Sequence, residues 1–280
     1  MGRCMMANFK KALANKGFVV GGCIFLAIAL IALVGPLVWT VDPNAQEMTL
    51  RLSAPSPAHP FGCDDFGRDL LARVIAGARV SLGVGIAVTL ATSALGLVIG
   101  AYACYNERLD HILMRICDGL MSIPGVLLAI ALMAMMGASA WNVIIALSIV
   151  YTPSMARIVR SRAMVVKEEP FVEALRVQGA STARIVWLHI VPNVMAPFLV
   201  QATFVFAEAV LSEAALSFLG LGIKAPDASW GNILQAGKNV MRKAWWMIFF
   251  PAAAIIASVL SLNLAGDGLR DALDPKTKEG

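Results

Sequence analysis

The sequence predicts an all-α, polytopic membrane protein with six transmembrane helices. Of its 280 residues, 59% are hydrophobic and only 15% are charged, against roughly 45–50% and about 25% in a soluble domain. The mean hydropathy of +0.74 agrees with this contrast. So few charges cannot cover a water-exposed surface, and much of the outside must therefore face lipid. This composition excludes a disordered chain, a nucleic-acid-binding domain and a disulfide-rich scaffold.

Six apolar segments approach or exceed the roughly 20 residues that a helix needs to cross the hydrocarbon core. The predicted spans are residues 18–39, 80–103, 119–137, 141–156, 194–221 and 244–265. The fourth segment ends early, at Arg157, so we expect its helix to continue into the following segment. Prolines within or at the ends of spans should kink helices or occupy first turns; they are Pro124, Pro153, Pro197 and Pro251. Gly96 and Gly100 form a G-x-x-x-G pair that favours a close helix contact.

A basic leader precedes the first span and contains Arg3, Lys10, Lys11 and Lys16. The apolar run that follows is longer than the 7–15 residues of a secretory signal core, and no small-x-small cleavage site follows it. We therefore expect an uncleaved anchor.

The distribution of basic residues predicts that both termini lie in the cytoplasm. With the N-terminus inside, the inner segments hold 15 Lys and Arg residues and the outer segments hold 8, as the positive-inside rule requires. Four tryptophans then lie near the outer interface, as in an aromatic belt; they are Trp39, Trp141, Trp245 and Trp246. Cys63 becomes the one cysteine in the oxidising compartment, so no intrachain disulfide is expected.

The longest predicted inner segment, residues 157–193, contains signals for two short helices. Pro170 suits a first turn, with Glu168 and Glu169 near the positive end of the helix dipole. Residues 171–178 then form the first helix, and Gly179 ends it.

A second helix is predicted to follow. Ser181 or Thr182 can cap it, it should reach His189, and Pro192 should break it before the fifth span. Two functions suit such a pair. It can be an amphipathic pair that rests on lipid headgroups, or it can dock a cytoplasmic partner.

The spacing in this loop resembles the EAA loop of ABC importer permeases, E-A-A-x3-G-x9-I-x-L-P. The matching residues are Glu173, Ala174, Leu175, Gly179, His189, Ile190, Val191 and Pro192. Leu175, His189 and Val191 depart from the pattern. In that family the loop is a coupling helix that docks into a cleft on the ATP-binding subunit. The resemblance implies a coupling role for Glu173, Ala174, Leu175, Gly179, Ala180, Ile185, His189 and Pro192. We also expect a side chain at position 179 to crowd the turn and the partner surface.

Three further segments resemble the peptide class of these permeases, in the same order along the chain. Residues 59–69 match H-P-F-G-T-D-x-x-G-R-D except that Cys63 replaces Thr. Residues 216–222, with the following Pro226 and residues 229–232, match the segment after span five, and residues 263–275 match the C-terminal ending. Together these matches are similar to the C-type permease of dipeptide, oligopeptide and nickel importers, and they imply the MetI-like ABC importer permease fold.

This resemblance implies three regions and a set of partners. Residues 1–78 would hold the leader, the first span and a periplasmic segment. Residues 79–270 would form the permease domain, with coupling loop 157–193, and residues 271–280 a cytoplasmic tail. The partners implied are a second permease in a heterodimer, two ATPase subunits, a periplasmic or extracellular substrate-binding protein and the lipid bilayer of the bacterial inner membrane. ATP and Mg²⁺ would bind the partner subunits, and this chain would carry no cofactor.

The remaining residues predict no enzyme. The chain has no G-x-x-x-x-G-K-[ST] motif and no catalytic constellation, and the three histidines are too scattered for a metal site. Glu208 and Glu213 lie within the fifth span, where carboxylates normally face protein or water. Each can be a structural hydrogen-bond partner or part of a substrate path. Dipeptides or oligopeptides are the first expectation and nickel the second; an ion-coupled secondary carrier is a further alternative.

Overall fold

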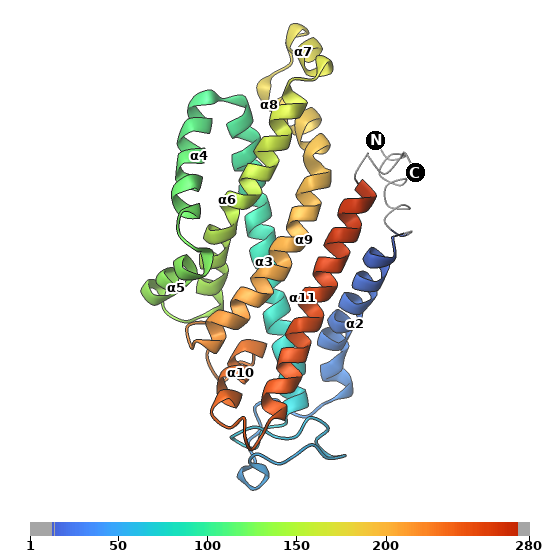
Figure 1. Cartoon of the computed structure of the whole chain (residues 1–280), viewed down its shortest axis with the longest axis vertical. Helices are drawn as coiled ribbons and strands as arrows, with labels where there is room; N and C mark the ends of the chain where they lie inside the picture. The colour runs from blue at the N-terminus through green and yellow to red at the C-terminus, as the bar shows by residue number, and fades with distance from the viewer. Residues whose placement is uncertain (1–12, 14, 274–280) are drawn as a thin grey trace.

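The computed structural model describes residue 13 and residues 15–273, and in that part of the chain it is all helical with no strand (Figure 1). Its long helices form an elongated bundle; they are α2 (Lys16–Val38), α3 (Leu70–Tyr105), α6 (Ala140–Lys167), α9 (Val191–Phe218) and α11 (Trp246–Leu273). Five helical segments are long and apolar enough to cross a membrane. The leader up to residue 12, with Cys4, and residues 274–280 of the predicted tail lie outside the described residues.

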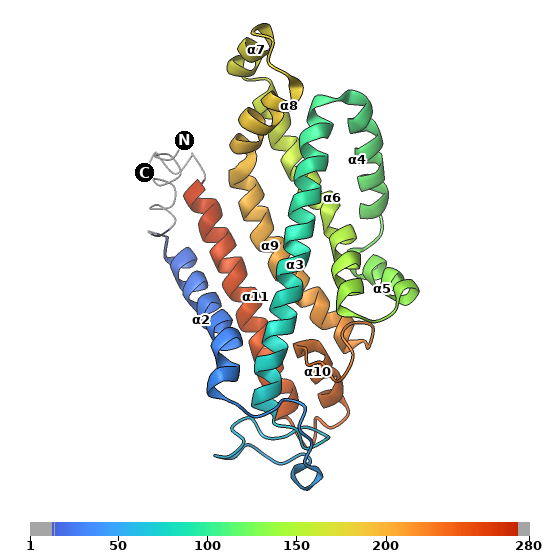
Figure 2. The ribbon, with the colours of Figure 1, turned by 180° about the vertical axis from the view of Figure 1, so that it is seen from behind.

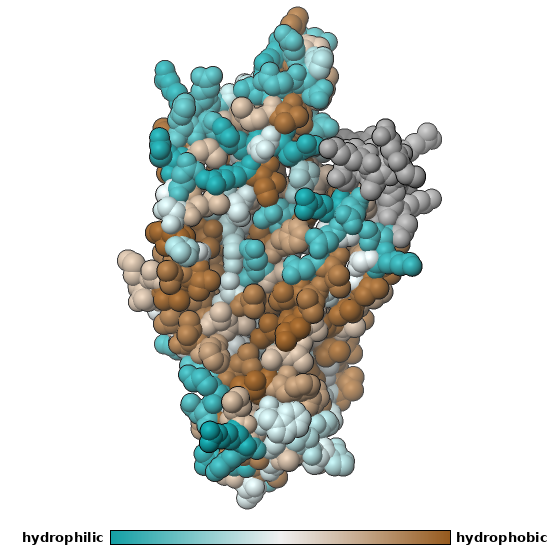
Figure 3. All heavy atoms as spheres, in the orientation of Figure 1, coloured by the Kyte–Doolittle hydropathy of each residue, from teal (hydrophilic) through white to brown (hydrophobic). Residues whose placement is uncertain are grey.

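The short elements lie at the two ends of the bundle and on one flank. They are η1 (Met48–Leu50), α4 (Glu107–Met121), α5 (Gly125–Met136), α7 (Pro170–Val177), α8 (Thr182–Ile185), the π turn η2 (Val186–Ile190) and α10 (Trp230–Lys238). Helix α7 occupies the tip of one end, whereas residues 39–69 and α10 close the other end (Figure 1). A belt of hydrophobic residues separates two hydrophilic ends (Figure 3), as a protein that crosses a bilayer requires.

Helix α3 is the longest element and lies at the centre of the bundle, with α6 and α9 packed against it (Figure 2). It begins at Asp69, whose carboxylate accepts a hydrogen bond from the backbone N–H of Ala72 at 2.7 Å. The predicted Gly96–Gly100 contact is confirmed: a Cβ at Gly100 would lie only 2.7 Å from the Cβ of Val159 in α6. The two glycines therefore let the α3 and α6 backbones approach closely.

The predicted third span, residues 119–137, is wrong as a single helix. Helix α4 ends at Met121, α5 begins at Gly125, and their axes differ by 90°. Pro124 has no N–H for a helical bond and disfavours helical geometry at Ile123, so the chain turns here. At about 1.5 Å per residue, the 12 residues of α5 cannot cross the bilayer alone. A sixth crossing exists only if α4 and α5 together count as a broken span.

The fourth span agrees with expectation, whereas the start of the fifth does not. Helix α6 continues to Lys167, so the expected extension is confirmed and residues 157–167 are helical rather than loop. Pro192 does not break the second short helix, because helical structure runs from Thr182 to Phe218. The π turn η2 immediately precedes the proline. A wide π turn is a common way for a helix to absorb a missing backbone bond.

Candidate functional site

Helix α7 and the turn after it form residues 168–182, which project beyond the rest of the bundle (Figure 1). We call this segment the docking loop, after the role that the sequence predicts for it. Pro170 lies in the first turn of α7, as predicted. At its end, the N–H of Gly179 bonds to the carbonyl of Arg176 and the N–H of Ala180 to that of Leu175, both at 3.0 Å. These two bonds define a Schellman motif, in which Gly179 adopts φ +77°. Ser181 then caps α8, as expected.

The expected crowding at Gly179 is wrong within this chain. A Cβ at Gly179 would meet no atom within 4 Å. The constraint is the positive φ, which an L side chain adopts only at a cost.

Aromatic side chains at the end of α3 hold the docking loop and the π turn η2. Arg176 Nε donates to Tyr105 Oη at 3.2 Å, and Trp187 Nε1 donates to Tyr102 Oη at 3.2 Å. The guanidinium of Arg176 also lies 5.3 Å from the centre of the Tyr105 ring. No local sequence pattern pointed to these tyrosines, because they lie far from the loop along the chain.

The predicted coupling residues divide into two groups by exposure. Glu173, Ala174 and Gly179 are exposed on the surface of the loop, where a partner can contact them. Ile185 is fully buried, and the remaining members are half-buried; they are Leu175, Ala180, His189 and Pro192. Val177, which the motif does not include, exposes 85% of its surface.

At the opposite end, the motif at residues 59–69 folds a compact cap. Asp69 accepts a hydrogen bond from Trp39 Nε1 at 3.0 Å and contacts His59 Nδ1 at 2.7 Å. Asp64 accepts from Arg68 Nε at 2.6 Å. Cys63 is fully buried. Burial, helped by Asp69, Asp64 and Glu47, raises the pKa of its thiol to about 11.

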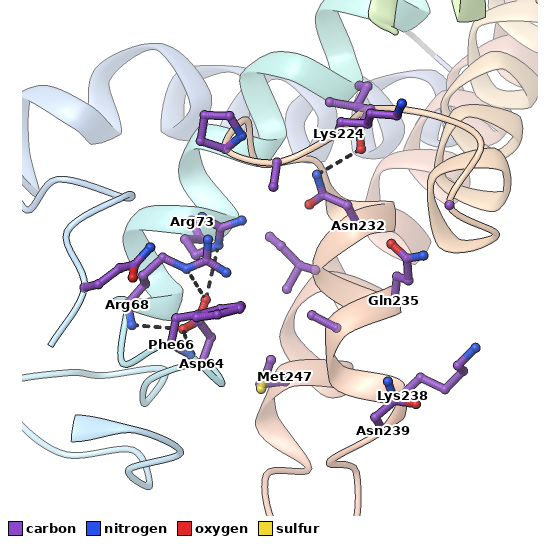
Figure 4. A pocket seen from close by; sticks show the side chains of 17 residues that line it. Asp64, Phe66, Arg68, Arg73, Lys224, Asn232, Gln235, Lys238, Asn239 and Met247 are labelled. Atoms are coloured by element: carbon purple, nitrogen blue, oxygen red, sulfur yellow. Dashed lines mark hydrogen bonds and ion pairs between the residues drawn. The ribbon is translucent and has the colours of Figure 1, made fainter. Parts of the chain in front are cut away.

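A groove of about 670 Å³ separates this cap from α10 (Figure 4). Arg68 and Arg73 lie with Asp64 on one wall, and Asn232 and Gln235 of α10 lie on the other. Four of the lining residues are cationic and one is anionic; they are Arg68, Arg73, Lys224, Lys238 and Asp64. The groove is therefore a polar, positively charged surface.

The two carboxylates of the fifth span face different surroundings. Glu213 is fully buried, and its carboxylate accepts hydrogen bonds from Ser81 Oγ at 2.6 Å and Ser217 Oγ at 2.7 Å. Glu208 is exposed and lines an open cleft of about 290 Å³ between α9 and α11. The structure therefore does not bring the two predicted path residues together. Only Glu208 faces open space in this conformation.

Residues 93–279 match the family described as the binding-protein-dependent transport system inner membrane component. The match covers more than half of the chain. The chain belongs to this family. Residues 8–55 also match the N-terminal transmembrane domain of oligopeptide transport permease C.

Similar permeases come from several bacteria. A protein of Brucella abortus that is named as a peptide transport system permease is 46% identical, over 96% of this chain and 91% of its own length. The dipeptide transport system permease of Alkalihalophilus pseudofirmus is 42% identical, over 96% and 89%. The di/tripeptide transport system permease of Pseudomonas aeruginosa is 38% identical, over 98% and 93%.

Membership in this family confirms the predicted family and fold class. It excludes the alternative of an ion-coupled carrier. The protein is a multi-pass, inner-membrane permease of a binding-protein-dependent transport system. No group of three or more potential metal ligands occurs among residues 15–273. The motifs at residues 59–69 and 173–192 now have structural counterparts, in the cap and in the docking loop with its following helix.

Proposed function

We propose that this permease carries dipeptides or oligopeptides into the cytoplasm as part of an ATP-driven importer. The peptide and dipeptide names of its relatives support peptides over nickel. The observation that carries the coupling role is the docking loop, which leaves the bundle at one end and is hydrogen-bonded to the central helix α3.

In this proposal the loop docks on an ATPase subunit through Glu173, Ala174, Gly179 and Val177. The half-buried and buried members of the motif, from Leu175 to Pro192, hold the loop on the permease. Two ATPase subunits would bind ATP and Mg²⁺, and this chain would contribute no catalytic group or cofactor.

The proposal also includes the remaining partners of the importer. A second permease would complete a heterodimer in the bilayer. The cap and the cationic groove would face the substrate-binding protein on the outer side, and both termini would then lie in the cytoplasm. Residues 1–78 would then comprise the leader, anchor and outer segment, residues 79–270 the permease domain, and residues 271–280 the tail.

Reconstitution tests the proposal. The permease is purified with the ATPase, second permease and binding protein from its own cells, and uptake is measured in proteoliposomes. We expect ATP-dependent uptake of a labelled dipeptide that unlabelled dipeptides inhibit and Ni²⁺ does not. Uptake of ⁶³Ni²⁺ without peptide uptake would support the nickel alternative. A complex that contains no ATPase would overturn the coupling assignment.

A further inference from the structure

The cleft between α9 and α11 combines three polar side chains with an apolar lining. Gln201 and Glu208 come from α9 and Asn263 comes from α11. The apolar wall includes Phe204, Leu211 and Val259. Figure 3 shows hydrophilic patches that interrupt the hydrophobic belt on the face where α9 and α11 lie in front.

The carboxylate of Glu208 has no hydrogen-bond or ion-pair partner among the residues that the structure describes. The neighbouring polar groups are satisfied without it: Tyr151 Oη bonds to Ser212 Oγ at 2.7 Å and to the backbone carbonyl of Glu208 at 3.3 Å. Glu213, one and a half turns further along α9, has two serine donors. This chain therefore satisfies the enclosed carboxylate and leaves the open one available to a ligand.

The three polar side chains match one chemical group. One carboxylate and two amide carbonyls provide three accepting groups, and a primary ammonium has three N–H donors and no acceptor. The α-ammonium of a peptide has a pKa of roughly 8 and is mostly charged at neutral pH. A charge-assisted hydrogen bond to a carboxylate is also stronger than a neutral one.

We propose that the cleft of Gln201, Glu208 and Asn263 binds the α-ammonium group of a peptide during its passage through the membrane. This inference rests on the proposed peptide transport. The cleft is at the small end of the range for ligand pockets, so it fits the amino terminus and first residue rather than a whole peptide. Phe204, Leu211 and Val259 would contact the first side chain.

Protection of an engineered thiol tests this binding without requiring transport. Leu211→Cys places a thiol in the cleft of the purified permease complex, and mass spectrometry of the peptide containing residue 211 reports its alkylation rate. The probes are alanyl-alanine and N-acetyl-alanyl-alanine, each titrated into the millimolar range. We expect the free dipeptide to slow alkylation and the acetylated one to leave it unchanged. Nε-acetyl-lysine keeps only the α-ammonium, and Nα-acetyl-lysine keeps only the side-chain ammonium. Comparing their protection therefore distinguishes the two groups.

Adding Glu208→Gln to Leu211→Cys should abolish protection, and Asn263→Ala should weaken it. In the complete importer, Glu208→Gln should lower kcat/KM for dipeptide uptake about tenfold. Glu107→Gln, which removes an exposed carboxylate at the start of α4, is the control and should retain the parent rate.

Four outcomes separate the possibilities. Absence of dipeptide uptake by the parent importer would refute the proposed function itself. Normal uptake with equal alkylation in the presence and absence of alanyl-alanine would overturn the cleft assignment alone. Equal protection by the acetylated dipeptide would overturn the ammonium assignment. Loss of the second permease from Glu208→Gln complexes would show that Glu208 pairs with a group of that subunit, and would also overturn it.

Discussion

Gly179 shows how one backbone angle can control a docking surface. Its φ of +77° costs most L residues roughly 1–2 kcal/mol, and Asn tolerates this region better than Ala or Val. Because a Cβ meets no neighbour there, the cost is conformational. We predict that ATPase retention and peptide uptake fall in the order Gly, Asn, Ala, Val at position 179.

Affinity purification and uptake assays measure both quantities on the same preparation. Membrane insertion, followed by yield, should stay constant, since the loop lies outside the bundle. Equal ATPase retention in Gly179→Asn and Gly179→Val complexes would contradict a role for this backbone angle.

Glu213 is a residue whose environment predicts a structural role. Glu213→Ala would leave the hydroxyls of Ser81 and Ser217 without their acceptor, and an unsatisfied buried group costs about 1–3 kcal/mol. We predict a lower unfolding temperature and yield for this variant, with Glu213→Gln intermediate because its amide oxygen still accepts. Thermal unfolding of the detergent-purified complex measures the effect. Glu208→Gln is the matched control and should unfold at the parent temperature; an equal loss in both would remove the distinction between the two carboxylates.

At the scale of elements, α3 connects the two ends of the molecule. Its far end bonds to Arg176 and Trp187 through two tyrosines. Near its start, the carbonyl of Val74 accepts from Trp230 Nε1 of α10 at 3.1 Å. One continuous helix is therefore bonded to Arg176 of the docking loop at one end and to α10 at the other.

The Arg176–Tyr105 contact can be tested by a double-mutant cycle. Tyr105→Phe removes the hydrogen bond to Arg176 and keeps the ring, whereas Arg176→Ala removes both the bond and the cation–π contact. We predict uptake in the order parent, Tyr105→Phe, Arg176→Ala, with the double variant no worse than Arg176→Ala. ATPase activity measured in the same proteoliposomes should become less dependent on peptide-loaded binding protein. Strictly additive losses would show that the two residues act separately.

The sequence predicted helices better than it predicted their breaks. The lengths of the apolar segments identified the spans that the structure shows as α2, α3, α6, α9 and α11. In lipid, a spanning segment must form all its backbone hydrogen bonds internally and therefore has to be a long apolar helix. Proline chemistry marked Pro124 as a position where a helix kinks or begins, but not that the chain bends by 90° there between two separate helices. It also did not reveal that Pro192 continues a helix. Both prolines lack an N–H, but whether the chain bends or adds a π turn depends on what packs around it, which local pattern does not encode.

At the scale of the whole molecule, the motifs located the candidate sites without describing their contacts. The spacing at residues 173–192 identified the docking loop. It did not indicate that Tyr102 and Tyr105 contact this part of the chain. Glu208 and Glu213 looked alike in sequence, as two carboxylates in one span. Tertiary packing separates them, because the serines that enclose Glu213 come from α3 as well as α9.

The whole molecule also determines how its orientation must be tested. Cys63, the cysteine that the sequence predicts on the outer side, is fully buried, with a pKa of about 11. A protonated, enclosed thiol reacts poorly with maleimides, so labelling of the parent protein cannot report the side on which the cap lies. Ala58, directly before the cap, and Val177 in the docking loop are both exposed, and a cysteine at either position is open to a reagent. They lie at opposite ends of the bundle, so their labelling should be mutually exclusive.

We predict that a membrane-impermeant maleimide labels Ala58→Cys in sealed spheroplasts and Val177→Cys in inverted vesicles. The physical reason is the excess of Lys and Arg on the docking-loop side, which retains those segments in the cytoplasm. Site-resolved mass spectrometry separates the engineered thiol from native cysteines, and labelling after denaturation confirms that each site can react. Labelling of Val177→Cys in sealed spheroplasts would place the docking loop outside the cell. An ATPase in the cytoplasm could not then reach α7, and both the orientation and the coupling assignment would have to be abandoned.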